Sequence, residues 1–276
     1  MIKIKILKFK HFLKSKLLEN SSLKKLNQSG LEGSLISQAF LETANCEFNS
    51  KKDKQLFEKL NQYKLELYAN NNNISFEEIG SAIVMKVNEI AHRASSSGIW
   101  KKFFYNLSKK NNVKNILEVG TNLGISGQYF IKALEDKKKT KFITLEGVKE
   151  LCKIASERFN SISTEERFEI IQGLYDETLP KLIKRNISFD LVFIDGNHRY
   201  ESTLKYFELI KNNLSDGCLV IFDDINWSRG MSRAWQDICK QQGIVFSINF
   251  FKLGMIVFDP KKSKPTNDHY ELFLSS

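Results

Sequence analysis

The sequence lacks the features that would indicate a disulfide-rich, zinc-binding or membrane-spanning protein. Its four cysteines stand singly among 276 residues, and none of them forms a C-x-x-C pair. Compact zinc sites use such pairs, and disulfide frameworks belong to oxidising compartments. No apolar run approaches the roughly 18 residues that a membrane-spanning helix needs. These absences predict free thiols, a reducing compartment and a cytoplasmic location.

Acidic residues are scarce at the N-terminus. Residues 1–30 hold eight lysines and a single glutamate, which makes +7 of the chain's net charge of +10 and leaves +3 for the remainder. A domain this close to neutral does not have the basic surface of a nucleic-acid-binding protein. We therefore expect no nucleic-acid partner, and the positive charge belongs to the N-terminal arm.

The arm reads M-I-K-I-K-I-L-K-F-K-H-F-L-K-S-K-L-L. Its apolar residues recur at helical spacing, with lysines between them, at Ile2, Ile6, Phe9, Leu13 and Leu17. This pattern predicts a basic amphipathic helix. Lysines interrupt every candidate apolar core and no small-residue cleavage site follows, so the arm is not a signal peptide. Three roles fit it: packing on the domain, a homodimer contact, or peripheral contact of residues 1–18 with the inner face of a membrane.

Residues 1–110 are expected to form a helical extension in front of the main domain. Apolar positions that repeat every three or four residues predict helices at 53–69, 76–93 and 99–109, with a loosely helical connection at 20–52. The asparagine run at 70–73 should end the first of these helices. Serines followed by a glycine at 95–98 should end the second.

From residue 114 onward, strand-like and helix-like segments alternate. The expected strands are 114–119, 141–146, 167–172, 189–195, 217–223, 244–251 and 253–259, and the expected helices are 124–136, 149–160, 176–185, 200–213 and 229–242. Strands separated by helices predict a parallel sheet, and the short K-L-G link predicts that the last two strands form an antiparallel hairpin. We therefore predict an α/β fold with a Rossmann-like sheet of seven strands, five parallel plus this hairpin. It would occupy 111–260 and leave a polar tail at 261–276 with little to bury.

The segment K-N-I-L-E-V-G-T-N-L-G-I-S at 114–126 is a strand that breaks into glycines and leads into a helix. Glycine lets the backbone approach a ligand, and a helix N-terminus offers free N–H groups. The loop G-T-N-L-G is not the dinucleotide fingerprint G-x-G-x-x-G, and Glu118 would repel a pyrophosphate but could hold an ammonium group. The next strand ends in Glu146, where a carboxylate accepts hydrogen bonds from ribose hydroxyls. This combination suits S-adenosylmethionine (SAM), which has an amino-acid head and no phosphate.

Four motifs together resemble the class I SAM-dependent methyltransferases: I-L-E-V-G-T-N-L-G-I-S, F-I-T-L-E-G, F-D-L-V-F-I-D-G-N-H-R-Y and V-I-F-D-D-I-N-W. The likeness is greatest to the small O-methyltransferases of the catechol and caffeoyl-CoA type and to a bacterial branch with a D-G-x-H-x-Y turn. It implies SAM as cofactor and a small hydroxylated molecule as acceptor. The cofactor-binding residues that it implies are Glu118, Gly120, Thr121, Asn122, Gly124, Ser126, Glu146, Gly147, Gly173, Leu174 and Asp195. Leu174 departs from the polar residue that similar enzymes place near the adenine.

Carboxylates also follow the fourth and fifth strands. Asp195 ends one strand, and Asp223 and Asp224 end the next. Adjacent strands lie about 4.8 Å apart, so the three side chains can converge on one point, where they repel one another unless a cation intervenes. A hard divalent ion, Mg²⁺, suits such oxygen ligands. The alternative is that Asp223 and Asp224 are loop and cap residues of a metal-free enzyme.

His198 stands three residues after Asp195, where catechol-type enzymes have a lysine base. Histidine can accept a proton near neutral pH, so we expect His198 to act as catalytic base beside Asp195. The alternative is that His198 only orders the loop or stacks over the cofactor. The function predicted is SAM-dependent O-methylation of a small hydroxylated acceptor. The alternative function is that of a SAM-binding or cephalosporin-hydroxylase-like relative with a different or no methyl-transfer activity.

Overall fold

The computed structural model of the chain describes residues 2–45, 50–93, 98–110 and 113–274. The chain divides into two compact units, one made of 1–38 with 183–275 and the other of 39–182. The boundary falls inside helix α2 (Leu31–Asn45). Each unit has its own hydrogen-bonded strands and its own covering helices.

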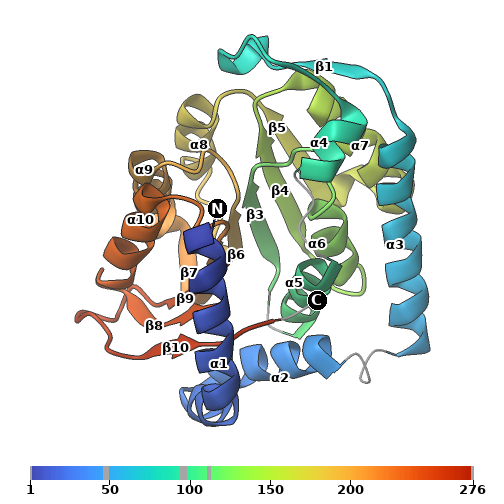
Figure 1. Ribbon diagram of the computed structural model, residues 1–276. Coiled ribbons are helices and arrows are strands. Elements are labelled where there is room, and N and C mark those ends of the chain that lie inside the picture. The colour runs from blue at the N-terminus through green and yellow to red at the C-terminus, as the bar shows by residue number, and fades with distance from the viewer. Residues whose placement is uncertain (1, 46–49, 94–97, 111–112, 275–276) are drawn as a thin grey trace. The chain divides into compact units, whose positions relative to one another are not determined.

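The 39–182 unit contains three parallel strands in the order β3-β4-β5 (Figure 1). The strands are β3 (Asn115–Val119), β4 (Lys141–Glu146) and β5 (Phe168–Gln172). The helices of this unit are α3 (Lys51–Ala69), α4 (Val87–Arg93), α5 (Gly98–Lys110), α6 (Gly127–Ala133), α7 (Lys149–Ile162) and α8 (Tyr175–Ile183). A 3₁₀ turn, Glu165–Arg167, precedes β5. Apart from the segment at 76–93, each predicted strand and helix of this unit is present within a few residues of its expected bounds.

Aromatic rings make a continuous row through the core of this unit. Phe104, Phe130, Phe142, Phe159 and Phe168 come from α5, α6, β4, α7 and β5, and successive ring centroids lie 5.4, 5.9, 5.8 and 5.4 Å apart. Such ring pairs add about 0.5–1.5 kcal/mol each to the burial of their area. The row therefore fixes the helices against the strands whose ends carry the candidate site.

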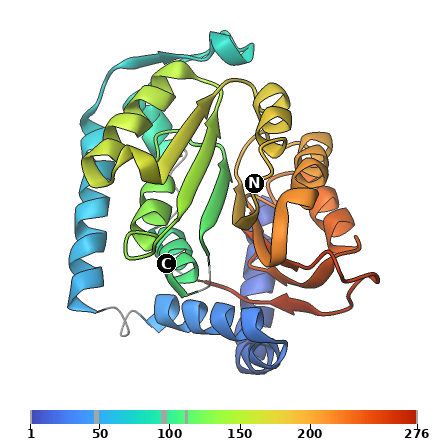
Figure 2. The same ribbon diagram turned by 180° about the vertical axis from the view of Figure 1, so that it is seen from behind.

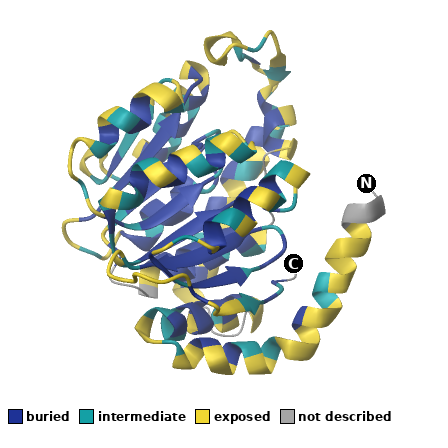
Figure 3. Ribbon diagram, turned by 90° about the vertical axis from the view of Figure 1, so that its left-hand side faces the viewer, coloured by how far each residue is buried: buried dark blue, intermediate teal, exposed yellow. Residues whose placement is uncertain are grey.

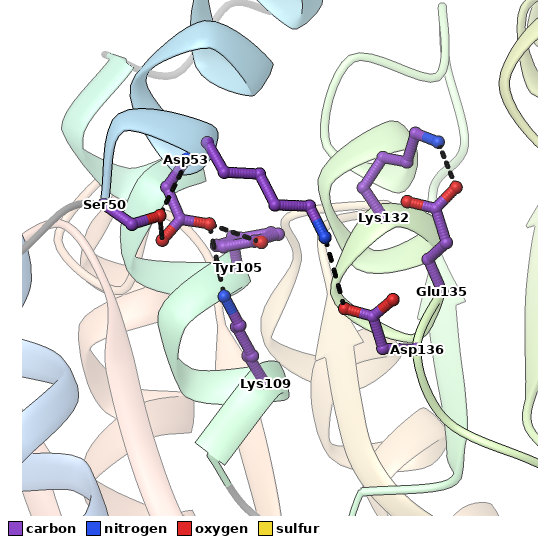
Figure 4. Close-up of polar contacts among 8 residues, drawn as sticks. Ser50, Asp53, Tyr105, Lys109, Lys132, Glu135 and Asp136 are labelled. Atoms are coloured by element: carbon purple, nitrogen blue, oxygen red, sulfur yellow. Dashed lines mark hydrogen bonds and ion pairs between the residues drawn. The ribbon is translucent and has the colours of Figure 1, made fainter.

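Helix α3 is fastened to α5 through one acidic side chain, Asp53 (Figure 4). Its carboxylate accepts hydrogen bonds from the Tyr105 hydroxyl at 2.9 Å, from Ser50 Oγ at 2.9 Å and from Lys109 Nζ at 3.2 Å. Burial alone would raise the pKa of Asp53, but these hydrogen bonds outweigh it and lower the pKa. Asp53 is therefore a charged anchor between two helices of the extension.

The prediction of a single helix at 76–93 is wrong. The segment instead forms strand β1 (Asn73–Ser75), a 3₁₀ turn (Glu77–Ile79), strand β2 (Val84–Lys86) and α4, with β1 and β2 paired antiparallel. Gly80 ends the turn in the left-handed region, at φ +75°. A helix cannot continue through that conformation, which the apolar periodicity did not reveal. The expected break at 95–98 lies almost wholly outside the described residues, and so does Cys46.

The unit of 1–38 with 183–275 contains five strands in the order β10-β8-β9-β7-β6, seen from behind in Figure 2. The strands are β6 (Phe189–Ile194), β7 (Leu214–Phe222), β8 (Ile244–Asn249), β9 (Gly254–Phe258) and β10 (His269–Glu271). The helices are α1 (Ile2–Gln28), α9 (Tyr200–Ile210) and α10 (Arg229–Cys239), and a 3₁₀ turn, Lys211–Asn213, lies between α9 and β7. β6 and β7 are parallel, whereas β9 runs antiparallel to both β7 and β8. The seven expected strands, with their C-terminal hairpin, are thus confirmed.

The tail at 261–276 differs from the expectation. It contributes the extra strand β10, which pairs parallel with β8, and it buries Leu272 and Leu274. A strand of three residues is too short to show an alternating pattern in a polar sequence. The connection expected at 20–52 is also more regular, because α1 runs to Gln28 and α2 begins at Leu31.

The N-terminal arm is a helix, as predicted, and it lies against the tail within the same unit. His11 Nε2 is 3.0 Å from the carbonyl oxygen of Leu272, and Phe12 packs edge-on against Phe273 with ring centroids 5.2 Å apart. Figure 3 shows most of α1 exposed. Among the described helices, α1 included, none has the length and apolarity needed to cross a bilayer.

Candidate functional site

The loop between β3 and α6 folds back onto the end of β4. The backbone N–H groups of Gly120 and Thr121 both donate to the carbonyl oxygen of Leu145 at 3.1 Å. Gly120 has φ +113° and Gly124 has φ +71°. A Cβ at Gly124 would meet the Phe159 ring of α7 at 2.9 Å, so only glycine fits there. The turn predicted from the glycines is therefore formed, and both glycines are required by backbone geometry.

Glu118 is fully buried at the end of β3. One of its oxygens accepts a hydrogen bond from Ser126 Oγ at 2.5 Å and the other from Thr144 Oγ1 at 2.8 Å. Burial raises the pKa of Glu118 to about 8, against the lowering effect of these two hydrogen bonds. Both carboxylate oxygens already have partners inside the protein. Glu118 is thus placed to position Ser126 and Thr144 instead of touching a ligand directly.

This buried carboxyl makes folding stability depend on pH. Its pKa is raised from 4.5 to about 8, so the folded protein favours the neutral form and loses stability as the pH rises from 4.5 toward 8. Relative to Glu118→Gln, the wild type should lose roughly 2–4 kcal/mol across this window. Urea unfolding at several pH values measures the difference, with Glu157→Gln, an exposed α7 site, as control. A constant difference between the two proteins would show that Glu118 is ionised throughout.

Glu146, at the end of β4, joins the glycine loop to the start of α7. Its carboxylate accepts hydrogen bonds from the backbone N–H groups of Asn122 at 2.8 Å and Val148 at 3.0 Å. Its own carbonyl oxygen accepts a hydrogen bond from Gly173 N at 2.8 Å, which brings the end of β5 to the same place. Burial raises the pKa of Glu146, again against its hydrogen bonds. Glu118, the glycine loop, Glu146 and Gly173 therefore form one cradle at the strand ends.

Two further predicted positions lie at the edge of this cradle. Gly147 follows Glu146, and its carbonyl oxygen accepts a hydrogen bond from Gln172 Nε2 at 3.3 Å. Leu174 follows Gly173, and its side chain is exposed. The carbonyl oxygen of Leu174 accepts a hydrogen bond from Thr178 N at 2.9 Å, at the start of α8. An exposed leucine at this edge offers an apolar surface where similar enzymes have a polar side chain.

One residue of the cradle could not be recognised in the sequence. Tyr63 of α3 donates a hydrogen bond from its hydroxyl to the carbonyl oxygen of Leu123, within the glycine loop, at 2.7 Å. The Arg158 guanidinium stacks over the Tyr63 ring at 4.7 Å and donates to Gln128 Oε1 at 2.9 Å. Tyr63 occupies one of the apolar positions of its helix, so the sequence marked it only as core. It links the helical extension to the glycine loop.

The residues predicted to act on the acceptor lie in the other unit. Asp195 follows β6, and its Oδ1 lies 3.6 Å from His198 Nε2. The loop between them is tied to α9, because Asn197 Nδ2 donates to Ser202 Oγ at 2.9 Å and to the Tyr206 hydroxyl at 3.2 Å. Asn197 itself has φ +51°. The side chains of Asp195 and His198 are both partly exposed, so the pair is formed and accessible to solvent.

Asp223 and Asp224 follow β7, and a lysine that the sequence did not single out lies against them. Lys252 Nζ is 2.8 Å from both carboxylate oxygens of Asp223 and 3.6 Å from Asp224 Oδ1. Burial would lower the pKa of Lys252, but attraction to the two aspartates outweighs it and raises the pKa. The pKa of Asp224 is raised, by burial first and then by repulsion from Asp223. Lys252 supplies the positive charge that this pair of acids requires.

The loop that carries Lys252 is held in a defined position. The carbonyl oxygen of Lys252 accepts a hydrogen bond from Ile225 N at 3.1 Å, and the carbonyl oxygen of Phe251 accepts one from Asn226 Nδ2 at 2.7 Å. Phe251 has φ +72°, a conformation that is unfavourable for a bulky residue. Such strain persists only where the surroundings enforce it. The ammonium group is therefore fixed between the acids.

The arrangement does not fit the Mg²⁺ site predicted from the three aspartates. Both oxygens of Asp223 are occupied by the lysine, so they are not free to bind a divalent ion in this arrangement. Among the described residues, which include Asp195, Asp223 and Asp224, no group of three or more acidic, histidine or cysteine side chains is placed to hold a metal. Asp223 and Asp224 thus form ion pairs with Lys252, whereas Asp195 pairs with His198.

Comparison with known proteins finds similarity to methyltransferases. Residues 117–225 match the methyltransferase-domain family Methyltransf_24. A catechol O-methyltransferase of Niastella koreensis is 26% identical over 176 residues, which cover 62% of this chain and 74% of that protein. The matched family spans the glycine turn, Glu146, Asp195 and the Asp223–Asp224 pair.

Solved structures share the fold. The O-methyltransferase of Bacillus cereus, in complex with S-adenosylhomocysteine (SAH), aligns with a TM-score of 0.55 at 19% identity and covers 79% of this chain and 96% of its own. A Staphylococcus aureus protein of the caffeoyl-CoA O-methyltransferase type aligns with a TM-score of 0.52 at 22% identity, and the match covers 71% of this chain and 98% of that protein. The chain is therefore similar to a methyltransferase domain over residues 117–225, it shares its fold with solved methyltransferases, and the relatives that it matches are named as O-methyltransferases.

Proposed function

We propose that the protein transfers the methyl group of SAM to an oxygen atom of a small hydroxylated acceptor. The observation that carries this proposal is the cradle of Glu118, the glycine loop and Glu146 in a chain related to a catechol O-methyltransferase. Bound SAM supplies a methyl group on a positively charged sulfur. The acceptor oxygen attacks that methyl carbon, the carbon–sulfur bond breaks, and SAH leaves.

The cradle residues have distinct roles in this proposal. Glu146 accepts from the ribose hydroxyls while its backbone contacts hold the glycine loop. Ser126, positioned by Glu118, and the backbone of Gly120, Thr121 and Asn122 line the methionine part. Gly147, Gly173 and Leu174 border the adenine, which would meet backbone N–H groups and the apolar side chain of Leu174. We infer that burial of Glu118 serves geometry, because its oxygens already have hydrogen-bond partners.

His198 is the base in this proposal. It takes the proton of the acceptor hydroxyl, and Asp195, 3.6 Å away, stabilises the resulting imidazolium. Lys252 offsets part of the negative charge of Asp223 and Asp224, the task that the sequence assigned to Mg²⁺. Positioning of the two reactants supplies much of the acceleration, as in other bimolecular enzyme reactions. We also place the protein in the cytoplasm, because Cys152, Cys218 and Cys239 are free thiols.

A direct assay tests the proposed reaction. The purified protein is mixed with SAM and catechol, and mass spectrometry looks for SAH and the methyl ether in equal amounts. Both products should appear only with active protein. If SAM binds but neither catechol nor a panel of other phenols and alcohols yields SAH, the protein is a SAM-binding or cephalosporin-hydroxylase-like relative without this activity.

The cofactor half of the proposal has its own test in Glu146→Ala. Loss of charge-assisted hydrogen bonds to the ribose and of the anchor for the glycine loop should weaken SAM binding by about 1.5–3 kcal/mol. Calorimetric titration with SAM measures the change, and Glu150→Ala, an exposed acidic site on α7, is the matched control. Equal affinities of both variants and wild type would remove Glu146 from the SAM site.

A further inference from the structure

Helix α1 has one face that contacts the rest of its unit and an opposite face that is exposed, and two further exposed leucines, Leu7 and Leu18, lie beside the contacting face. On the inner face, His11 and Phe12 contact the C-terminal segment, Ser15 is fully buried, and Lys14 pairs with Glu271 at 2.8 Å. These contacts fix the rotation of the helix about its axis. Whatever lies on the opposite side of α1 is therefore presented outward in a defined orientation.

The outward face is apolar. Its members are Ile6, Phe9, Leu13 and Leu17, with exposed fractions of 50%, 60%, 45% and 85%. Their spacing of three or four residues puts them in one stripe along the helix. Scattered exposed apolar residues are ordinary, but an aligned row opposite the packed face is the mark of an interaction surface. Packing on the domain, one of the three roles open for the arm, therefore accounts for the inner face only.

Lysines border this stripe on both sides. At 100° per residue, Lys10 falls on one flank, next to Lys14 at the border of the inner face, and Lys5 and Lys16 fall on the other flank. Lys16 also pairs with Glu19, the only acidic residue of the helix, at 2.9 Å. An apolar stripe between two rows of lysines is the arrangement with which amphipathic helices lie in the surface of an anionic bilayer. The apolar side chains enter the acyl boundary while the ammonium groups meet lipid phosphates.

We propose that α1 binds an anionic phospholipid surface through this stripe and its flanking lysines. A second copy of the chain is a poorer occupant, because pairing two such faces would place lysine against lysine. A nucleic acid is poorer too, since four apolar side chains would lie between the cations and the phosphates. The surface uses none of the residues assigned to the SAM cradle or to the aspartate loops, so the proposal does not depend on the proposed function.

Vesicle flotation with the full chain tests this surface. Wild type should float with vesicles that contain phosphatidylglycerol, and about tenfold less with pure phosphatidylcholine vesicles. The double variants Phe9→Ser/Leu13→Ser and Lys5→Glu/Lys10→Glu should each lose about tenfold of the binding. Leu65→Ser, which removes an exposed leucine from α3, should bind as the wild type does. Raised salt should weaken binding of the wild type.

Two measurements keep the result interpretable. SAM affinity and thermal unfolding of each variant show whether the fold is intact, and gel filtration gives the oligomeric state. Wild-type binding that is absent from anionic vesicles, or that both double variants retain, overturns the proposal. A wild-type dimer that Phe9→Ser/Leu13→Ser converts to a monomer, with no vesicle binding, would assign the stripe to a second copy instead.

Discussion

Replacing His198 by alanine is expected to lower turnover by about 10²–10⁴-fold while leaving SAM affinity nearly unchanged. The reason is that different residues are proposed to bind SAM and to accept the proton. The proposed SAM cradle is built from the ends of β3, β4 and β5, whereas His198 follows β6 beside Asp195. Removing the imidazole deletes the proton acceptor but none of the cradle contacts. The measurement is SAH formation at saturating SAM, with calorimetric SAM binding alongside.

The pH–rate profile separates a base from a loop-ordering residue. If His198 accepts the proton, the ascending limb of the wild-type profile should be missing in His198→Ala. His92→Ala, the same substitution at an exposed site on α4, should keep both the rate and the limb. A His198→Ala profile with the same limb and a rate within about threefold of wild type would make His198 a loop-ordering residue.

Lys252→Met is expected to be the other severe change. It leaves the buried carboxylate of Asp223 without its partner, 2.8 Å away in the wild type, and leaves Asp223 and Asp224 to repel each other. The cost should be about 1–3 kcal/mol of stability for a partly exposed pair, together with a fall in turnover of at least about tenfold. Urea unfolding and SAH formation measure the two effects. Lys252→Arg, which retains the charge, should recover most of the stability.

Added Mg²⁺ gives this variant a distinctive signature. Once the lysine is gone, the freed carboxylates become ligands for a hard cation, so Mg²⁺ should restore part of the Lys252→Met activity and stability but change the wild type little. Lys240→Met, at an exposed lysine that pairs with Asp237 at 3.7 Å, is the matched control. If Lys252→Met without metal has the stability and turnover of the wild type, the ion pair has no functional role.

The sequence predicted most of the sheet because parallel strands buried on both faces read as apolar runs. Ile116 and Phe142 lie in such runs, and the polar residues that follow them, Glu118 and Glu146, were correctly placed at strand ends. The stretch at 76–93 failed because Gly80 and its turn interrupt a sequence whose apolar spacing is still helical. Strand β10 was missed because three residues in a polar tail carry no detectable alternation.

The site was predicted less completely, for a different physical reason. Lys252 lies 29 residues beyond Asp223, in a short hairpin loop, and only the antiparallel pairing of β9 with β7 brings it back to the aspartates. Nothing in the local sequence K-L-G indicates such a contact. Tyr63 was hidden in the same way, 60 residues before its partner Leu123. The acids could be read from the strand ends, but the groups that neutralise or brace them come from distant segments.

The most direct test of this account is methyl transfer from SAM to catechol in excess EDTA, compared with the same reaction in added Mg²⁺. If Lys252 provides the positive charge beside Asp223 and Asp224, SAH and the methyl ether should form at nearly the same rate in both conditions. Turnover that disappears in EDTA and returns with Mg²⁺ would contradict the account. It would mean that the three aspartates take up a divalent ion and that Lys252 moves away during catalysis.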